Sequence, residues 1–369
     1  MLPASSDVVV VGGGVVGAAA LYYLAERGCE CPLLLERETL GSGSTGACAG
    51  GVRTMFSDQL NVGIGLESIR RLQRFEEEVG TTLDLRLWGY LFLLTEDDDV
   101  ARFEAAIGLQ HRYGIEARML SAGEAQELVP QLAVDDVNAA AFCPLAGYVT
   151  PDLVVQGYVR RAVERGAKVE QSCPATRIVT RNGRVAGVET PRGEISTEHV
   201  ICAAGVWSRE LAATAALDLP VRPEQRWMFF TEDAPDFPQR LPLTIDFSTG
   251  FYFHREGDAL VFGGREQSLD ELAPVAVHRV PSLEMLGVRS SWWGYYEMTP
   301  DHNAIVGAAE VPAGLLYATG FSGHGFQQAP VIGEHLAELA LGLEPTFDLA
   351  PFSITRFAEG RKRVERNVV

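Results

Sequence analysis

Apolar residues recur along this chain with two different periods, and the pattern is clearest near the amino terminus. Residues 8–11 are four consecutive valines, a β-branched run of the kind that is buried in a parallel sheet. Residues 18–24 continue as a helix rich in small apolar side chains, and residues 33–35 form a second short apolar run. A strand, a helix and a strand in this order predict a βαβ unit.

The turn between the first strand and the helix carries glycines in the spacing G-x-G-x-x-G, at Gly12, Gly14 and Gly17. In a dinucleotide site the first glycine allows the tight turn, the second lets backbone amides approach a pyrophosphate, and the third lets the helix pack on the strand. The helix amino terminus adds free N–H groups and partial positive charge. Glu36 follows the second strand, where an acid accepts hydrogen bonds from a ribose. These residues predict a bound dinucleotide but do not distinguish NAD from FAD.

The rest of the chain divides into helical and β-rich stretches. Helical periodicity predicts helices over residues 60–79, 97–113, 151–165 and 329–341. Strands are expected at residues 88–94, 139–142, 199–202, 303–306 and 315–319, with a hairpin turn at Asn182-Gly183. Residues 221–266 have the pattern of strands separated by proline-bounded loops, at 227–231, 250–255 and 259–264.

A helix-poor block between two α/β blocks predicts a second domain. The predicted fold class is therefore α/β combined with α+β: a Rossmann-like nucleotide-binding domain with a substrate domain built on an antiparallel sheet. The basic segment at residues 361–363 is expected to be a solvated, mobile end.

Composition narrows the possible partners. The chain has 369 residues, 47% hydrophobic and 22% charged, as in a soluble globular protein with more than one core. Its formal net charge of −18 argues against nucleic acid, because phosphates would be repelled. The six cysteines form no CxxC pair and no metal-ligand spacing, so we expect reduced thiols and no metal site. The amino terminus lacks a basic region before its apolar stretch, so we expect no signal peptide, and no apolar span of membrane length occurs; together these predict a cytoplasmic protein.

Residues 41–51 are rich in glycine, serine and alanine. Two interpretations are open: a flexible linker, or a loop whose backbone and hydroxyl groups contact a flat ligand. Linkers of this composition seldom lie inside a nucleotide-binding unit, which favours ligand contact.

Three blocks of the sequence carry a family resemblance. They are the glycine fingerprint with residues 41–53, the stretch Met298-Thr-Pro-Asp-His-Asn303 with Gly307, and Gly320-Phe-Ser-Gly-His-Gly-Phe326. Together they resemble the FAD-dependent amine oxidoreductases of the D-amino acid oxidase superfamily. Within it the chain is most similar to the β-subunits of sarcosine oxidase and dye-linked proline dehydrogenase, with glycine oxidase a more distant likeness. The resemblance covers nearly the whole chain and implies FAD rather than NAD.

The resemblance also implies how the chain divides and where FAD binds. An FAD-binding domain would be assembled from residues 1–85, 140–220 and 300–369, and a substrate or cap domain from residues 86–139 and 221–299. The cofactor-binding positions carried over are Gly12, Gly14, Val15, Val16, Gly17, Glu36, Arg37, Ser44, Thr45, Ala49, Gly50, Ala175, Ala203, Ala204, Gly205, Trp207, Gly320, Gly323, His324, Gly325, Phe326 and Gln327. The segment from Gly320 would lie against the flavin ring, where amides at a helix amino terminus stabilise the negative charge of the reduced form.

Five residues are candidates for handling the substrate: Arg53, Tyr252, His254, Tyr296 and His324. Arg53 follows the flavin-contacting loop and is the first choice for a positive charge near the ring, with a surface ion pair as the alternative. Tyr252 matches a family tyrosine that donates to the substrate carboxylate. His254 shares its strand face by alternation, so both side chains reach the site or both are half-buried sheet residues. His324 either donates toward the flavin or fixes the glycine-rich loop, and Tyr296 is expected to line the pocket.

The chain departs from the family pattern in two respects. Monomeric sarcosine oxidases attach FAD through a cysteine just before the Thr-Pro-Asp block, whereas no cysteine follows Cys202, so the FAD is expected to be non-covalent. Cations for the substrate carboxylate are also missing. Those oxidases have a lysine where this chain has Gln327, and glycine oxidase has an arginine in the region of residues 294–297. Arg53 is then the remaining cation, or the substrate binds differently.

The leading functional hypothesis is FAD-dependent oxidation of a sarcosine-, proline- or glycine-like amino acid or secondary amine to the imine. The electron acceptor would be oxygen or another redox partner. Related chains serve in multi-subunit complexes, so an oligomer or a heteromeric subunit is an expected form. Two alternatives are a non-catalytic flavoprotein subunit or assembly factor, and a 2-hydroxyacid dehydrogenase on the same scaffold.

Overall fold

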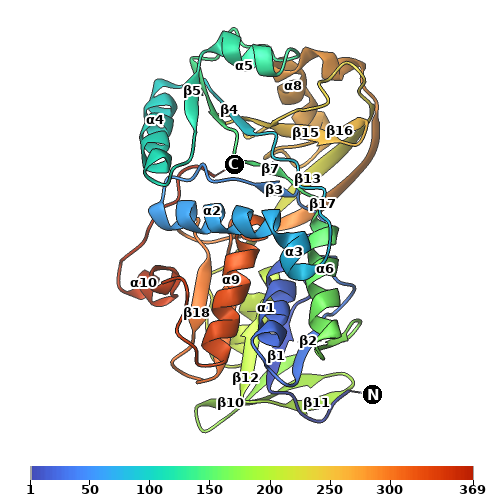
Figure 1. Cartoon of the computed structure of the whole chain (residues 1–369), viewed down its shortest axis with the longest axis vertical. Helices are drawn as coiled ribbons and strands as arrows, with labels where there is room; N and C mark the ends of the chain where they lie inside the picture. Colours follow the sequence, from blue (N-terminus) through green and yellow to red (C-terminus); the bar gives the residue numbers. More distant parts are fainter. Residues whose placement is uncertain (1, 369) are drawn as a thin grey trace.

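The computed structural model describes residues 2–368, which form two parts along the long axis of the molecule (Figure 1). The lower part in that view contains a six-stranded sheet and the upper part an eight-stranded sheet. Among the described residues, a three-stranded and a two-stranded sheet complete the strand pairing. This mixed architecture confirms the predicted fold class.

The six-stranded sheet is organised around β1, which has a parallel neighbour on each side. Its strands in spatial order are β18 (Ile305–Ala308), β19 (Leu315–Thr319), β12 (His199–Cys202), β1 (Val8–Val11), β2 (Pro32–Leu35) and β8 (Lys168–Glu170). Val8 and Val10 pack into one hydrophobic cluster, whereas Val9 and Val11 pack into another. Both faces of β1 are therefore buried, which explains its unbroken apolar sequence.

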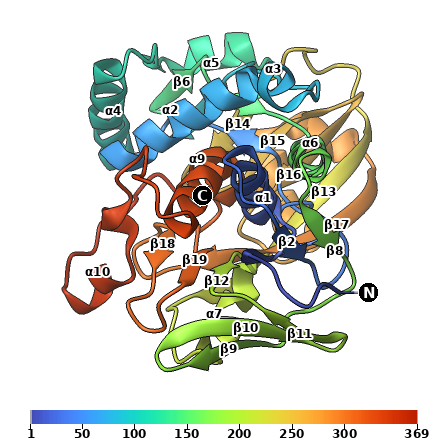
Figure 2. The ribbon, with the colours of Figure 1, turned by 60° about the horizontal axis from the view of Figure 1, so that its bottom comes forward.

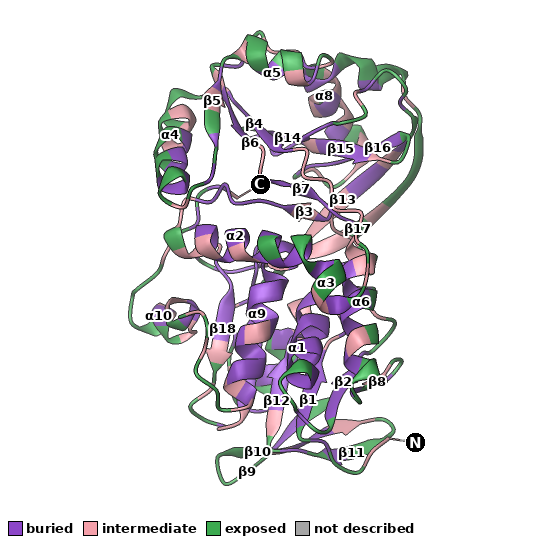
Figure 3. Cartoon of the chain, viewed as in Figure 1, coloured by how far each residue is buried: buried purple, intermediate pink, exposed green. Residues whose placement is uncertain are grey.

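Three long helices pack on the Val8 and Val10 side of this sheet (Figure 2). They are α1 (Val15–Glu26), α6 (Pro151–Glu164) and α9 (Gly325–Ala340). Helix α1 contacts both of the others and is buried along nearly its whole length (Figure 3). A Cβ added to Gly333 of α9 would lie 2.5 Å from the Cβ of Ala19 in α1, so these helices approach closely because glycine stands there.

The opposite face of β1 packs against residues of the three-stranded sheet. Its strands are β9 (Arg177–Arg181), β10 (Arg184–Thr190) and β11 (Gly193–Ser196). Asn182 and Gly183 both have positive φ, 51° and 74°, between β9 and β10. These values confirm the predicted hairpin turn.

The eight-stranded sheet is built from two separated stretches of sequence. Its strands in spatial order are β17 (Val288–Met298), β13 (Arg222–Asp233), β16 (Ala259–Gly263), β15 (Tyr252–Glu256), β14 (Leu243–Asp246), β4 (Tyr90–Leu94), β6 (Ala139–Cys143) and β5 (Arg118–Leu120). The pairing is antiparallel except between β14 and β4. Helices α4 (Asp97–Arg112), α5 (Ala122–Leu128) and α8 (Leu269–Arg279) flank this sheet (Figure 1). Neither α5 nor α8 was predicted.

Two boundaries differ from the sequence-based expectation. The helix predicted over residues 60–79 is divided into α2 (Gln59–Gln73) and α3 (Phe75–Val79), and the ring of Phe75 packs edge-on against Tyr158 at 4.8 Å. The domain boundary expected at residue 140 falls inside β6, because β6 pairs with β4 in the eight-stranded sheet.

The segment beyond residue 360 is only in part the solvated end that we expected: Arg361 and Lys362 are exposed, whereas the residues after them are held by other parts of the chain. Arg363 donates to the carboxylate of Asp58 at 2.6 Å, and the buried carboxylate of Glu365 accepts the amide and hydroxyl of Ser57 at 2.9 and 2.7 Å. Asn367 is fully buried. Side-chain hydrogen bonding across the chain therefore fixes this segment, which the local sequence did not reveal.

The remaining elements are short. They are β3 (Gly51–Val52), β7 (Gly147–Tyr148), α7 (Ser208–Ala213), α10 (Thr355–Ala358) and 3-10 helices at Gly205–Trp207, Pro281–Met285 and Ala350–Phe352. Within residues 2–368, no helix has the length and apolar character needed to cross a membrane. The same residues contain no cluster of His, Cys, Asp and Glu suited to a metal ion.

Candidate functional site

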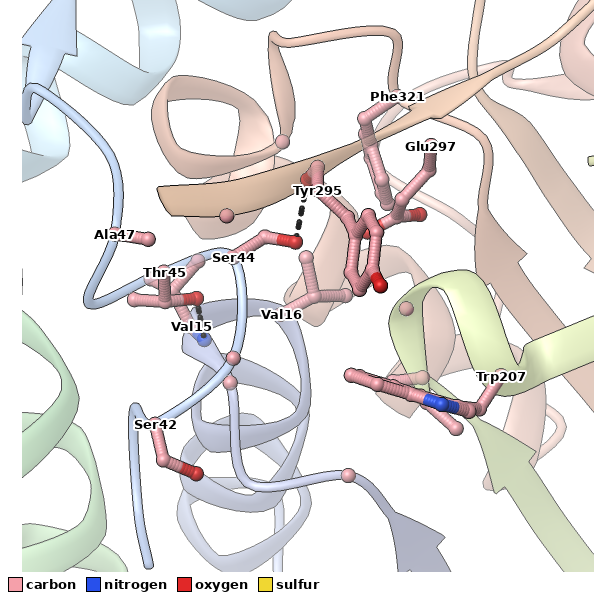
Figure 4. Close-up of a pocket in the computed structure, with 18 of the residues that line it drawn as sticks. Val15, Val16, Ser42, Ser44, Thr45, Ala47, Trp207, Tyr295, Glu297 and Phe321 are labelled. Atoms are coloured by element: carbon pink, nitrogen blue, oxygen red, sulfur yellow. Dashed lines mark hydrogen bonds between the residues drawn. The ribbon is translucent and has the colours of Figure 1, made fainter. Parts of the chain in front are cut away.

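One cavity is lined by residues of both parts of the molecule, some of which are drawn in Figure 4. The volume open to the centres of water-sized molecules is about 410 Å³, within the usual range of ligand sites. Its walls come from the turn after β1, the loops at residues 42–49 and 174–176, the segment 203–207, strands β13, β15 and β17, and the loop at 321–326. The two glycine-rich turns, one near each end of the sequence, thus meet at one cavity.

The turn between β1 and α1 is shaped by its glycines. Gly12 has a φ of 112°, and an added Cβ there would lie 2.3 Å from the carbonyl oxygen of Ala203. A Cβ on Gly17 would lie 1.9 Å from the carbonyl oxygen of Gly12, so the third glycine allows the helix to pack on the turn. Helix α1 begins without a side-chain cap, and Val15 N–H donates to Thr45 Oγ1 at 3.1 Å. A helix amino terminus whose N-cap residue has no side chain suits an anion.

One end of the cavity contains Glu36 and Arg37. The two carboxylate oxygens of Glu36 accept the N–H groups of Gly13 and Glu38, each at 2.7 Å, which fixes the carboxylate beside the turn. The guanidinium carbon of Arg37 lies 3.7 Å from the ring centre of Trp207. Other predicted residues on the walls are Gly14, Val16, Ala175, Ala203, Ala204 and Gly205.

The small-residue loop at 42–49 is held in place on the cavity wall (Figure 4). Ser44 Oγ donates to the carbonyl of Tyr295 at 2.6 Å, and Trp292 Nε1 donates to the carbonyl of Ala47 at 3.3 Å. Ser44, Thr45 and Ala49 line the cavity as anticipated. These bonds favour a ligand-contacting loop over a flexible linker.

The second glycine-rich turn leads from β19 into α9. Gly323, Gly325 and Phe326 line the cavity, and a Cβ added to Gly323 would lie 2.6 Å from the ring of Tyr296. Glu297 is also on the wall, and its Oε2 accepts the N–H of Gly320 at 2.8 Å. Burial raises the pKa of the Glu297 carboxyl above its ordinary value. Gly320 lies behind the wall and shapes the turn with a φ of 71°.

The far end of the cavity is formed by the eight-stranded sheet. Tyr252, Tyr296, Arg226 and Met228 line it, and the Tyr252 hydroxyl donates to the sulfur of Met228 at 2.6 Å. Burial raises the pKa of both tyrosines, so both hydroxyls remain protonated near neutral pH and act as hydrogen-bond donors. Arg226 and Met228 were not singled out in the sequence. Their spacing of two residues on one strand was the available signal.

Arg53 and His324 lie next to each other behind the wall. Arg53 donates to the carbonyls of Met55 and Asn367 at 2.6 and 2.7 Å, and its Nη2 lies 3.1 Å from His324 Nε2. Burial lowers the pKa of His324 well below its ordinary value. Gln327 is also turned away from the cavity, because its side-chain oxygen accepts the Arg53 N–H at 2.7 Å. The described residues on the cavity wall include none of these three.

His254 and Gly50 also lie off the cavity wall as far as residues 2–368 define it. The His254 ring is centred 4.2 Å from the ring of Tyr148, and its Nδ1 lies 3.0 Å from the carbonyl oxygen of Arg255. Gly50 has a φ of 66°, and an added Cβ would lie 2.1 Å from the carbonyl oxygen of Val149. Of the two strand-face candidates, the cavity therefore receives Tyr252 alone.

Known proteins resemble the chain over nearly its whole length. The family described as FAD dependent oxidoreductase matches residues 7–339. The chain belongs to this family. Its cofactor is FAD, as the resemblance in the sequence implied.

Relatives and solved structures agree with this assignment. Mitochondrial sarcosine dehydrogenase of Homo sapiens is 31% identical over 96% of the chain, although the chain spans only 42% of that protein. FAD-dependent oxidoreductase domain-containing protein 1 of Bos taurus is 30% identical over 100% of the chain and 88% of its own length. The crystal structure of L-proline dehydrogenase from P. horikoshii has a TM-score of 0.91 at 30% identity and covers 98% of the chain and 100% of its own.

The cavity has the features that FAD requires. The turn has no room for a Cβ at Gly12 or Gly17, so its backbone lies against the cavity. The amino terminus of α1, where Gly14 is the N-cap residue, suits a pyrophosphate. The fixed carboxylate of Glu36 retains lone pairs for ribose hydroxyl groups. The glycine-rich turn before α9 would hold the flavin ring, with Tyr296 beside it.

Proposed function

We propose that this chain oxidises an amino acid or secondary amine of the sarcosine, proline or glycine kind to the imine. One observation carries the proposal: a single cavity joins the nucleotide cradle at Gly12 to a buried end lined by Tyr252, Tyr296 and Arg226. The similarity to proteins named sarcosine dehydrogenase and L-proline dehydrogenase supports an amine as the substrate.

The residues of the chain bind and orient such a substrate. When bound, FAD supplies a two-electron acceptor for the hydride of the C–H bond next to the amine. Tyr296 would donate a hydrogen bond to the substrate, and Tyr252 would do so by turning its single O–H away from Met228. The aromatic side chains and backbone of the wall would position the bound amine beside the flavin.

We further propose that FAD is held without a covalent bond. Cys48 contributes the thiol among the described cavity residues, and burial raises its pKa to about 11. A protonated thiol is a poor nucleophile, so this side chain favours packing over attachment. Acid precipitation of the purified protein should therefore release all the yellow colour into solution.

We also propose how the two domains divide. The FAD-binding domain would consist of residues 1–85, 144–220 and 300–369, and the substrate domain of residues 86–143 and 221–299. Moving the boundary from 140 to 144 keeps β6 with its partner β4.

The test is anaerobic bleaching of the protein-bound flavin. Purified holoprotein is mixed with sarcosine, L-proline, glycine and, as a control, 2-hydroxyglutarate, and the flavin absorbance is followed. Bleaching by an amine, with the imine hydrolysis product recovered, supports the proposal. Reoxidation by air or by an added dye then identifies the class of acceptor.

Two outcomes would overturn it. Bleaching by 2-hydroxyglutarate alone would indicate an alcohol dehydrogenase on this scaffold. A yellow protein that neither amines nor hydroxyacids bleach would indicate a non-catalytic flavoprotein subunit.

A further inference from the structure

An amino-acid substrate needs a cation near the far end of the cavity, and the described cavity residues include two arginines, Arg37 and Arg226. Arg37 lies at the nucleotide end, stacked on Trp207 at 3.7 Å and adjacent in sequence to Glu36. Arg53, the first choice from the sequence, donates to two backbone carbonyls behind the wall. Among the described cavity residues, Arg226 is therefore the arginine available near the far end for the substrate carboxylate.

We propose that Arg226 anchors the substrate carboxylate, and that Glu224 is its internal competitor for the same guanidinium. This inference rests on the proposed function, since it names the residue that would select a carboxylate-bearing amine.

Strand pairing directs the Arg226 side chain. Arg226 on β13 pairs with Gly294 on the edge strand β17, and both residues line the cavity. Gly294 has no side chain, and a Cβ added there would lie 2.5 Å from the Cβ of Ala47, so the loop at residues 42–49 packs closely against β17 at this point. The guanidinium carbon lies 5.1 Å from the ring centre of Tyr296, which stands two residues beyond Gly294 on the same strand face.

The guanidinium keeps donors available for a ligand. Arg226 Nη1 donates to the carbonyl of Gln225 at 3.1 Å, and Nη2 lies 2.5 Å from Glu224 Oε1. A guanidinium offers a fork of further N–H groups beyond these contacts, and this fork matches a carboxylate in shape. The Arg226 side chain is 12% exposed, whereas that of Glu224 is 36% exposed, so Glu224 reaches the cation from the solvent side.

Charge at this end also favours Arg226. Burial raises the pKa of Tyr296, and the charge of Arg226 opposes that rise more strongly than the charge of Arg53 does. The neutral hydroxyls of Tyr252 and Tyr296 add donors without adding negative charge. A carboxylate placed here would meet the Arg226 guanidinium, which it would share with Glu224, and the hydroxyl of Tyr296, joined by that of Tyr252 once it turns away from Met228.

Binding of a non-oxidisable probe isolates this interaction from turnover. Methoxyacetate replaces the amine nitrogen of sarcosine with oxygen, and methoxyacetamide is the same molecule without the charge. Each is titrated into holoprotein, and the dissociation constant is obtained from the change in the flavin spectrum. The wild type should bind the carboxylate more tightly than the amide.

Three variants make the test specific. Arg226→Gln should weaken methoxyacetate binding by about 10- to 100-fold and leave the amide unchanged. Arg226→Lys should recover part of the loss, because the charge remains but the fork is gone. Glu224→Gln should tighten carboxylate binding, because the competitor is removed. Arg289→Gln, which removes an exposed arginine of β17 paired with Asp233, is the matched control and should bind as the wild type does.

Failure of the Arg226 assignment can be distinguished from failure of the proposed amine oxidation. Equal loss of carboxylate and amide in Arg226→Gln, or unchanged carboxylate binding, would overturn the anchor assignment. So would a wild type that is bleached by amines yet prefers the uncharged probe, and in that case the proposed function would stand. If Arg226→Gln fails to fold with flavin bound, Arg226→Lys and Glu224→Gln provide the test. Weaker methoxyacetate binding in Glu224→Gln would contradict the proposal that Glu224 competes for the Arg226 guanidinium.

Discussion

At the scale of single residues, what each candidate can do depends on where its polar atoms point. Arg53 and Arg226 are both largely buried arginines near the flavin-binding region. Arg53 uses its donors on backbone carbonyls and on His324, whereas Arg226 faces the cavity. The first therefore stabilises the loop around it, and the second is available to a ligand.

His254 was a candidate for handling the substrate, but it is buried off the cavity wall, where it affects the pH dependence of stability instead. Burial lowers the pKa of His254 to about 4, below the ordinary value of 6.5. The unfolded chain takes up a proton near pH 6.5 and the folded protein does not until about pH 4. Stability associated with neutral His254 is thus complete above pH 6.5 and is lost as the pH falls toward 4.

We predict that His254→Phe makes the protein less sensitive to acid. In the wild type, neutral His254 contributes about 3 kcal/mol to the free energy of unfolding above pH 6.5, because its pKa values in the unfolded and folded states differ by 2.5. Urea unfolding of wild type and variant at pH 7, 6 and 5 should show a shallower loss for the variant. His278→Phe, at a side chain 65% exposed, should keep the wild-type slope. Identical slopes for His254→Phe and wild type would contradict this account.

At the scale of elements, the contact between α1 and α9 holds the two glycine-rich turns together. Gly333 of α9 lies against Ala19 of α1, with an added Cβ only 2.7 Å from the Ala19 carbonyl carbon. Each helix begins at a turn that lines the cavity. Separating the helices would therefore widen the site as well as loosen the core.

We predict that Gly333→Ala destabilises the protein by about 1–3 kcal/mol, because the methyl group must displace backbone. The holoprotein should also lose flavin at a lower temperature. Gly108→Ala is the control: Gly108 is exposed on α4 with no atom near its added Cβ, so helix propensity alone should stabilise that variant by up to about 1 kcal/mol. A thermal midpoint for Gly333→Ala at or above the wild type would disprove the close-packing argument.

Two helices that the hydrophobic pattern missed had a local signature. Ser121 and Glu124 form a capping box at the start of α5. Ser268 accepts the Glu271 N–H at 3.3 Å at the start of α8. Both follow the S-x-x-E pattern, which predicts a helix amino terminus more reliably than apolar periodicity in such short helices.

At the scale of the whole molecule, distant segments are joined by buried polar contacts. Glu365 accepts hydrogen bonds from Ser57, from the Asp58 amide at 3.2 Å and from the Asn61 side chain at 3.0 Å. Asn367 extends the same junction to Arg53. The carboxy-terminal segment is thereby attached to the loop behind the candidate site.

We predict that Glu365→Gln lowers stability by about 1–3 kcal/mol, because an NH₂ group would replace one oxygen that accepts N–H donors. Differential scanning calorimetry of the holoprotein measures the change. Glu359→Gln removes a carboxylate that is 47% exposed and paired with Arg361, and it should have little effect. Equal shifts in the two variants would rule out a special role for the buried junction.

The sequence by itself determined the βαβ unit, the buried strand β1, the antiparallel sheet and the family. These depend on local backbone geometry and on side-chain period, which neighbouring residues set. Gly12 and Gly17 were recognisable because no larger residue fits such a turn.

Only the tertiary structure decided which polar side chains reach the cavity. Tyr252 and His254 alternate identically along β15, yet the cavity receives the first and Tyr148 covers the second. Arg226 and Arg53 are likewise distinguished by the pairing of β13 with β17 and by the carbonyl of Asn367, both remote in sequence. Direction and desolvation of a side chain are set by such distant partners, and no local pattern encodes them.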